Sequence, residues 1–240
     1  MLKQIYNTMK NILLIGGSYG IGLAIVKELE NGNNVFVASR SKENLEGLNV
    51  THIHFDALTD VLDTSNLPSV IDGLVYCPGS INLRPFRGLK PEAFEADLQI
   101  NFISLVKVIQ AVLPNLNASE QSSIVLFSSV AASMGMPFHT SVAAAKGAIE
   151  GFAKALAAEY APKIRVNVIA PSLTDTPLAD KFLSTDEKRE KSGLRHPLKR
   201  VGTSDDMAQM ASFLLSNKSS WISGQIFHVD GGMSTLLVNA

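Results

Sequence analysis

The sequence contains only one cysteine, Cys77, in 240 residues. A lone cysteine excludes a disulfide framework within the chain and is typical of proteins from a reducing compartment, so a cytoplasmic location is expected. No apolar run reaches the roughly 18 residues of a membrane-spanning helix, and the mixed, polar residues 1–10 lack the apolar core of a signal peptide. We therefore expect neither a membrane span nor a disulfide-bonded, exported protein.

Charged side chains are also few, and the two signs nearly cancel. They make up 18% of the chain, and the formal net charge is −1, which gives no electrostatic reason to expect nucleic acid or an anionic membrane surface as a partner. No group of His, Cys, Asp and Glu has the spacing of metal ligands, so no metal is expected. These absences leave a small-molecule substrate as the expected partner.

What the sequence does contain is a regular alternation of short apolar runs with longer helical stretches. Seven strands are predicted, over residues 11–15, 34–38, 50–55, 73–77, 123–127, 164–169 and 225–229. Four long helices are predicted, over residues 20–30, 91–113, 142–158 and 204–215. The alternation predicts a single α/β domain over residues 1–240, with a doubly wound, mostly parallel seven-stranded sheet and helices on both faces.

Local features refine this pattern. Ser204 is expected to cap the N-terminus of the helix 204–215, and Thr140 and Ser141 are expected to cap the alanine-rich helix 142–158. The segment 174–200 is long, charged and weakly periodic, which suits a mobile substrate lid better than a core element.

The first predicted strand runs into a glycine loop with the spacing G-x-x-x-G-x-G. Gly16 permits the tight turn out of the strand, Gly20 lets the backbone approach a pyrophosphate, and Gly22 lets the next helix pack against the sheet. The N-terminus of that helix offers free N–H groups and a partial positive charge to phosphates. This strand, loop and helix predict a dinucleotide-binding Rossmann fold, with a pyrophosphate site made of Gly16, Ser18, Tyr19, Gly20, Ile21 and Gly22.

The second predicted strand leads to Ser39 and Arg40. A Rossmann fold that prefers NAD carries an acidic residue near this point, where it binds the 2′-hydroxyl of the ribose. Here there is no acid, and Ser39 can hydrogen-bond a 2′-phosphate while Arg40 pairs with it and stacks on the adenine. The sequence therefore favours NADP(H) over NAD. The alternative is that Arg40 is only a solvated surface charge.

From the glycine loop to the C-terminus, the chain resembles the short-chain dehydrogenase/reductase family. The loop resembles the family's T-G-x-x-x-G-x-G, and residues 229–232, V-D-G-G, resemble its last strand and turn. The resemblance implies catalytic roles for Asn101, Ser129 and Lys146. It also implies contacts with the cofactor from Asp56, Gly79, Lys146, Pro171, Leu173 and Thr176.

Three departures from the family pattern surround the expected site. Residues 76–79, Y-C-P-G, stand where the family has N-N-A-G, and Ser172 stands where it has a glycine after the proline. In the signature Y-x-x-x-K the lysine is Lys146, but Val142 occupies the tyrosine position, and counting from Ser129 leads to the same place.

The valine matters because the resemblance implies that the tyrosine gives the proton in carbonyl reduction. The lysine would lower the pKa of that tyrosine and bind the nicotinamide ribose, the serine would orient the carbonyl, and the asparagine would position a water. Loss of one general acid costs about 10²–10⁴ in rate, so hydride transfer is expected to be slow unless another acid serves.

Two replacements for the acid are conceivable. His139 titrates near neutral pH, and it shares the face of Lys146 if the helix reaches back that far. The alternative is that His139 is a loop residue with a local hydrogen bond. The other replacement is a water molecule held by Ser129 and Lys146 in the space left by the phenol.

Two functions from different classes follow. The first is an NADP(H)-dependent oxidoreductase acting on a carbonyl or alcohol with an altered proton donor, and the second is a catalytically silent NADP(H)-binding protein, either a sensor or a partner subunit. Val142 favours the silent protein, whereas Asn101 and Ser129 favour the enzyme, because a pure binder has less need of them. Reduction of a C=C bond is a third option, and the resemblance also implies a homodimer or homotetramer.

Overall fold

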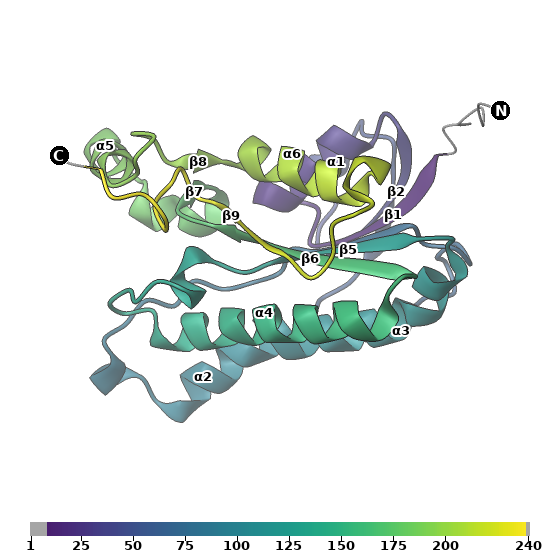
Figure 1. Ribbon diagram of the computed structural model, residues 1–240, viewed down its shortest axis with the longest axis horizontal. Helices are drawn as coiled ribbons and strands as arrows, with labels where there is room; N and C mark the ends of the chain where they lie inside the picture. The colour runs from purple at the N-terminus through teal and green to yellow at the C-terminus, as the bar shows by residue number, and fades with distance from the viewer. Residues whose placement is uncertain (1–8, 239–240) are drawn as a thin grey trace.

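Seven parallel strands form the central sheet of the computed structural model, which describes residues 9–238 (Figure 1). They are β1 (Lys10–Ile15), β2 (Asn33–Ser39), β3 (Val50–His54), β4 (Gly73–Tyr76), β5 (Ser122–Phe127), β6 (Ile164–Pro171) and β9 (Ile226–Val229). Their order in the sheet is β3-β2-β1-β4-β5-β6-β9. The predicted Rossmann fold is therefore confirmed, while the prediction for residues 1–10 falls largely outside the described residues.

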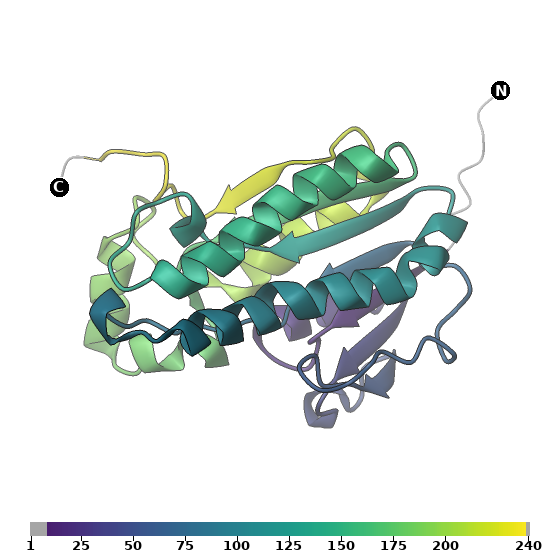
Figure 2. The same ribbon diagram turned by 90° about the horizontal axis from the view of Figure 1, so that it is seen from below.

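Helices cover both faces of the sheet. On one face lie α1 (Gly20–Leu29) and α6 (Ser204–Leu215), and on the other lie α4 (Thr140–Tyr160) and the helical stretch from α2 (Pro91–Leu98) to α3 (Ser104–Ala118) (Figures 1 and 2). Alternate residues of β1 enter the two resulting cores, with Leu13 and Ile15 in one and Ile12 and Leu14 in the other. The central strands are apolar throughout because both of their faces are buried.

The order of the strands places a crevice beside β1. The chain runs outward from β1 to β3 and then returns to place β4 on the other side of β1. Ligands of doubly wound sheets bind outside the carboxyl ends of the strands at this reversal. The turns that follow β1, β4, β5 and β6 all lie at those ends, so they are where a site is expected.

The long helix expected over residues 91–113 is interrupted and longer than predicted. A π-helical turn, η3 (Gln99–Ile103), joins α2 to α3. Within it, Asn101 Nδ2 donates a hydrogen bond to the carbonyl oxygen of Asp97 at 2.8 Å, four residues earlier. That oxygen is the acceptor an α-helix would use, so the side chain competes with the helical backbone pattern.

The stretch Pro91–Ala118 is long and apolar enough, by length and composition, to cross a membrane. Its apolar side chains nevertheless belong to the core between the helices and the sheet. The buried ones are Leu105, Val108, Ile109, Val112 and Leu116. Packing inside this domain accounts for the composition of the stretch.

Both predictions about helix caps are wrong. Thr203, and not Ser204, caps α6: its side chain accepts from the backbone N–H of Asp206 at 3.2 Å, and the carboxylate of Asp206 accepts from the backbone N–H of Thr203 at 2.7 Å. Helix α4 begins two residues earlier than predicted, so Thr140 and Ser141 lie inside it and cap nothing. Ser141 is buried, and its hydroxyl has no hydrogen-bond partner within the described residues.

The segment 174–200 contains more regular structure than its weak periodicity indicates. Strand β7 (Thr174–Asp175) pairs with β8 (Gly202–Thr203), and α5 (Asp186–Leu194) begins just after a 3₁₀ turn, η5. These pieces are short and bury few side chains, so they leave no long apolar stripe in the sequence. The 3₁₀ turns are η1 (Glu43–Leu45), η2 (Phe86–Gly88), η4 (Val130–Ala132), η5 (Pro177–Phe182) and η6 (Asn217–Ser219). A role for the segment as a lid stays a prediction.

Candidate functional site

The glycine loop follows β1 in a conformation that requires its glycines. Gly16 and Gly20 have φ angles of +79° and +51°, in the left-handed region that other residues rarely adopt. A Cβ on Gly22 would stand 2.2 Å from the carbonyl oxygen of Gly16. The N-terminus of α1 therefore lies directly against the turn, and its backbone N–H groups face the mouth of the crevice.

A hollow of about 270 Å³ opens at this loop. It is lined by the predicted contact residues Gly16, Ser18, Tyr19, Gly20, Ile21, Gly22, Ser39, Arg40, Asp56, Gly79 and Thr176. These residues come from the ends of four neighbouring strands, β3, β2, β1 and β4, and from the segment after β7. The structure thus brings together all of the predicted pyrophosphate and adenosine residues, and we refer to this space as the loop hollow.

At the adenosine end, Arg40 and Ser39 differ in what they offer a phosphate. Arg40 is exposed and, within residues 9–238, has no ion-pair partner. Ser39 is 4% exposed and already donates its hydroxyl proton to the carbonyl oxygen of Ser41 at 2.8 Å. Arg40 is therefore the stronger candidate for a 2′-phosphate. Asp56 accepts from the backbone N–H of Leu58 at 2.9 Å, which orders its turn.

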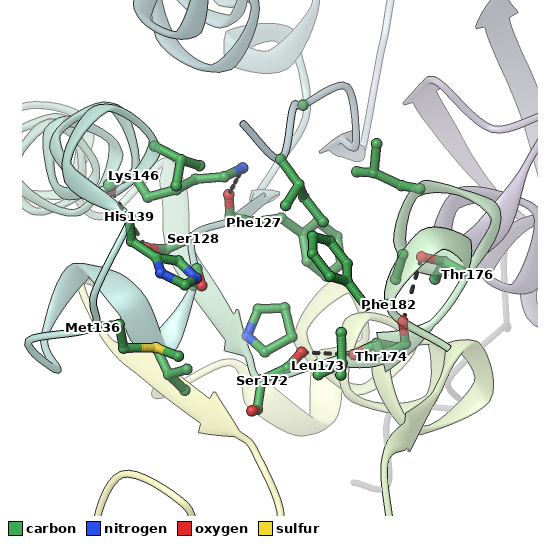
Figure 3. A pocket seen from close by; sticks show the side chains of 18 of the residues that line it. Phe127, Ser128, Met136, His139, Lys146, Ser172, Leu173, Thr174, Thr176 and Phe182 are labelled. Carbon is green, nitrogen blue, oxygen red and sulfur yellow. Dashed lines mark hydrogen bonds between the residues drawn. The ribbon is translucent and has the colours of Figure 1, made fainter. Parts of the chain in front are cut away.

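A second hollow, of about 360 Å³, adjoins the first and extends toward α4 (Figure 3). The two share the lining residues Ile21, Cys77, Gly79, Thr176 and Leu178. The wall of this second hollow, here called the substrate cavity, includes the predicted residues Ser129, His139, Lys146, Pro171, Leu173 and Thr176. A dinucleotide with its phosphates at the glycine loop would reach this cavity with its other end.

Lys146 lies on α4 with its ammonium group buried. Its Nζ donates to the carbonyl oxygen of Phe127 at 2.9 Å, at the end of β5. Burial lowers the pKa of Lys146 to about 8, while the electrostatic interactions with Cys77 and Asp97 act in the opposite direction. A lysine with this pKa is mostly charged at neutral pH yet loses its proton within the range of ordinary assays.

The buried ammonium of Lys146 should give the protein a characteristic dependence of stability on pH. The unfolded chain keeps the ordinary lysine pKa of 10.5, so between about pH 8 and 10.5 it binds more protons than the folded chain, and stability rises with pH. The loss of stability caused by burying the charged ammonium is complete below about pH 8 and absent above about pH 10.5. Its full size is about 3 kcal/mol.

Urea unfolding of the wild type and of Lys146→Met across this window isolates the effect. Both proteins are measured at the same pH values, so titrations elsewhere in the chain cancel in the difference. As pH rises from about 7 to 10, we expect the free energy of unfolding of the wild type to increase by up to about 3 kcal/mol relative to that of the variant. A difference in free energy of unfolding that stays constant with pH would contradict the lowered pKa.

Asn101 is fully buried and reaches the substrate cavity only through its neighbours. Its Nδ2 donates to Ser80 Oγ at 2.9 Å, and its Oδ1 accepts from the backbone N–H of Ser80 at 3.4 Å. A Cβ on Gly79 would stand 2.9 Å from Asn101 Oδ1 and 3.3 Å from Lys146 Nζ. The amide and the ammonium therefore both lie beside Gly79.

Sequence reasoning missed three residues beside Asn101, namely Ser80, Asn82 and Asp97. Ser80, which lines the substrate cavity, donates to Asp97 Oδ1 at 2.5 Å, and Asn82 donates to the same oxygen at 2.7 Å. Asp97 is fully buried, and its other carboxylate oxygen has no partner within the described residues. The available signal was a carboxylate four residues before Asn101 on a largely apolar helix.

The remaining predicted residues lie in the cavity wall. Ser129 Oγ accepts from the backbone N–H of Ala131 at 3.2 Å, which leaves its own proton free for a ligand. Val142 is 5% exposed and lines the cavity one helical turn before Lys146. None of the residues 9–238 that line this cavity is a tyrosine.

His139 directly precedes the N-terminus of α4 and lines the same cavity. Its Nδ1 donates to the carbonyl oxygen of Pro137 at 2.7 Å, because a carbonyl can only accept. The helix begins at Thr140, so it does not extend back through the histidine, yet the ring still shares the cavity with Lys146. Both predicted features, a local hydrogen bond and access to the site, are present together.

A Rossmann fold whose glycine loop leads to a cavity with a serine and a buried lysine is typical of dinucleotide-dependent oxidoreductases. A family profile described as enoyl-(acyl carrier protein) reductase matches residues 16–234. The chain belongs to the short-chain dehydrogenase/reductase family.

Three known proteins illustrate this membership. The chain is 35% identical to the 3-oxoacyl-(acyl carrier protein) reductase FabG of Chlamydia muridarum, over 94% of this chain and 97% of that protein. It superposes on the aldohexose dehydrogenase of Thermoplasma acidophilum with a TM-score of 0.89 and 26% identity, over 98% and 97% of the two chains. A gluconate 5-dehydrogenase from Burkholderia cenocepacia, solved in complex with NADP and tartrate, gives a TM-score of 0.86 and 26% identity, over 95% and 96%.

Proposed function

We propose that this protein is an NADP(H)-dependent oxidoreductase that acts on a carbonyl or alcohol substrate and uses a proton donor other than tyrosine. The observation that carries the proposal is the continuity of the loop hollow with the substrate cavity, where Ser129 and Lys146 lie. A cofactor bound along this path would bring its nicotinamide to these side chains. The reactive groups and the dinucleotide site then serve one reaction.

The residues of the loop hollow fit a phosphorylated dinucleotide. The space that a Cβ would fill at Gly22 is occupied by backbone, so the N-terminus of α1 stands close to where the pyrophosphate would bind. Arg40 would hold the 2′-phosphate, and Lys146, Pro171 and Leu173 would hold the nicotinamide end. When bound, NADPH supplies the hydride. The NADP in the similar gluconate 5-dehydrogenase supports this choice of cofactor.

Replacement of Arg40 by alanine should remove most of the preference for NADPH over NADH. A hydrogen bond to a charged group contributes about 1.5–3 kcal/mol, so the Kd for NADPH should rise by about 10- to 100-fold. The Kd for NADH should stay the same, because NADH has no 2′-phosphate. Calorimetric titration of both cofactors measures this, with Lys42→Ala as the control for loss of a nearby exposed cation. Equal affinity of the wild type for NADPH and NADH would contradict the assignment of Arg40.

At the substrate end, Ser129 is the donor for a carbonyl oxygen, because its proton is free. The charged Lys146 stabilises negative charge that develops nearby, and Asn101 and Ser80 support the turn at Gly79. Val142 can donate no proton. His139, whose Nε2 is left free by the hydrogen bond to Pro137, is one candidate for the acid, and a water held by Ser129 and Lys146 is another.

Val142 also favours a second function, a catalytically silent NADP(H)-binding protein. The two are distinguished by supplying NADPH with a panel of ketones, aldehydes and enones and following the loss of NADPH absorbance. Turnover of a ketone or aldehyde supports the oxidoreductase, and turnover of enones alone supports reduction of a C=C bond. Binding of NADPH without turnover of any substrate supports the silent protein.

Two further expectations accompany the proposal. Cys77 fits a reducing compartment such as the cytoplasm, and the family resemblance favours a homodimer or homotetramer. Sedimentation of the purified protein reports the number of subunits directly.

A further inference from the structure

A serine and a histidine that the proposed function does not use form a hydrogen-bonded pair in the wall of the substrate cavity. Ser172 Oγ lies 2.9 Å from His196 Nε2, and both residues line the cavity. Ser172 directly follows β6, at the carboxyl end of the sheet, and His196 follows α5. Figure 3 shows Ser172 in the same wall as Leu173 and Thr174.

The contact of the second ring nitrogen of His196 shows which of Ser172 and His196 donates the hydrogen bond between them. Nδ1 lies 2.9 Å from the carbonyl oxygen of Ser192, and a carbonyl can only accept, so Nδ1 carries a proton. In the neutral ring Nε2 is then the acceptor, and Ser172 donates to it. A second proton would add at Nε2, on the side that faces Ser172, without breaking the bond to Ser192.

This arrangement matches that of an activated hydroxyl: a hydroxyl, a base within 2.6–3.2 Å, and a third group that orients the base. His196 is 3% exposed, and its backbone N–H donates to the carbonyl oxygen of Gly193 at 3.0 Å. The ring is thus held in place, and because it lines the substrate cavity it can exchange a proton with solvent there. The sulfur of Met233, 3.0 Å from Ser172 Oγ, is the competing acceptor for the serine proton, but thioether sulfur accepts weakly.

No other histidine in the described residues combines these features. His52 Nε2 lies 3.2 Å from Ser39 Oγ, but neither residue lines the substrate cavity. His228 also has a serine partner, Ser133 at 3.1 Å, but it is exposed and does not line the cavity. His139 lines the cavity, but only its Nδ1 has a partner, and that partner is a carbonyl oxygen. Ser172 and His196 alone place a side-chain hydroxyl between an oriented imidazole and the cavity.

We propose that Ser172 and His196 exchange the proton with the substrate oxygen, the task for which Val142 offers no group. This inference rests on the proposed function. Pro171 and Leu173, the predicted nicotinamide contacts, flank Ser172 in the sequence. The serine therefore belongs to the segment that is expected to hold the nicotinamide end of the cofactor, and it lines the same cavity as Ser129 and Lys146.

The proton steps balance in the direction of reduction. As the carbonyl carbon gains a C–H bond, the electron pair of the C=O bond moves to oxygen, which takes the proton of Ser172 Oγ. Ser172 regains a proton from Nε2 of the protonated His196, and the neutral ring takes a proton from solvent. In alcohol oxidation the same groups carry the proton in the opposite direction, with neutral His196 as the final acceptor.

The acidic groups nearest His196 are held in their charged forms by ion pairs and hydrogen bonds. Ion pairing with Arg200 holds the pKa of Asp206 far below its usual range, and hydrogen bonds from Ser234 and Gly232 lower that of Asp230 against the effect of burial. The pKa of Arg200 is raised by the same ion pair. The charged groups of the cavity wall and the adjoining hollow are Lys146, Arg195, Arg200, Asp206 and Asp230.

The kinetic test compares His196→Gln and Ser172→Ala with His228→Gln, which alters a Ser–His pair outside the cavity. Glutamine can keep both hydrogen bonds of His196 but cannot shuttle a proton. We expect kcat for ketone reduction to fall about 100-fold or more in the first two variants, with the Kd for NADPH and the unfolding midpoint unchanged, and no fall in His228→Gln.

A second readout needs no turnover. Nitrogen-15 NMR of the imidazole rings, with the His196 signals identified by their loss in His196→Gln, reports which nitrogen carries the proton. We expect the Nδ1–H tautomer in the wild type and a changed Nε2 shift in Ser172→Ala. The Nε2–H tautomer would overturn the proposal, since Nε2 could not then accept from the serine.

The outcomes separate the two proposals. If the wild type reduces ketones and both variants match it, or only His139→Gln loses activity, the Ser172–His196 role is overturned and the oxidoreductase stands. If the wild type binds NADPH but turns over no substrate, the catalytic part of both proposals is overturned. If it binds no NADPH, the proposed function fails at its first step, and the inference that rests on it fails as well.

Discussion

Val142→Tyr should raise kcat for carbonyl reduction by about 100-fold, the low end of the 10²–10⁴ that one general acid contributes. The substituted side chain would begin one helical turn before Lys146, at a position that already lines the substrate cavity. The ammonium of Lys146 would lower the pKa of the new phenol and favour transfer of its proton. The low end applies because Ser172 and His196 would already deliver a proton in the wild type. Steady-state reduction of the best ketone from the panel measures the change.

Val142→Phe is the matched control, because it adds the ring without the hydroxyl. If bulk alone improved substrate binding, phenylalanine would give the same gain, and the interpretation through proton transfer would be wrong. The double variant Val142→Tyr/His196→Gln should retain the activity of Val142→Tyr, since the phenol bypasses the imidazole. If the wild type is inactive and only Val142→Tyr shows activity, the native chain is instead a cofactor-binding protein.

Gly22→Ala should abolish useful cofactor binding. The added Cβ would stand 2.2 Å from the carbonyl oxygen of Gly16 and 3.0 Å from the Cα of Gly17. Both atoms are backbone, so neither can rotate away, and the glycine loop must separate from α1. We expect the Kd for NADPH to rise by about 100-fold or more, equivalent to about 3 kcal/mol, together with a lower unfolding midpoint.

Gly32→Ala is the control for this second prediction. A Cβ on Gly32 would meet no heavy atom within 4 Å, and its backbone is not in the left-handed region. Calorimetry and thermal unfolding of the two variants, side by side, therefore separate a specific effect of the loop from a general effect of replacing glycine. Wild-type affinity in Gly22→Ala would show that the dinucleotide phosphates bind elsewhere.

Features that depend on local backbone requirements could be recognised in the sequence. The positive φ angles of Gly16 and Gly20 leave a glycine pattern between a strand and a helix, and this pattern located the loop hollow correctly. Ser129 and Lys146 could be located because each lies on or after one regular element, β5 or α4. The ends of the helices were harder to predict. Thr203 and Ser204 are both good capping residues, and only the extended backbone of Thr203 decides between them.

Features made by contacts between distant segments could not be recognised in this way. Ser172 and His196 are 24 positions apart, and nothing in either local sequence indicates that the turn after α5 returns to the end of β6. The hydrogen bond from Ser80 to Asp97 likewise joins a loop to a helix 17 positions later. The π turn at Asn101 arises from a single side chain that competes for a backbone oxygen, an effect too small to change the periodicity of a long helix.

The crowding at Gly79 bears on how this turn has diverged from its relatives and how it can be engineered. In residues 76–79 the glycine is the only position that agrees with the family's N-N-A-G. Any larger residue there would push apart the amide of Asn101 and the ammonium of Lys146. Tyr76 is constrained as well, because its ring is buried in the core and its hydroxyl donates to the carbonyl oxygen of Ile100 at 2.9 Å. A mutagenesis library that varies residues 77 and 78 while holding Tyr76 and Gly79 constant should retain more functional members than one that also varies Gly79.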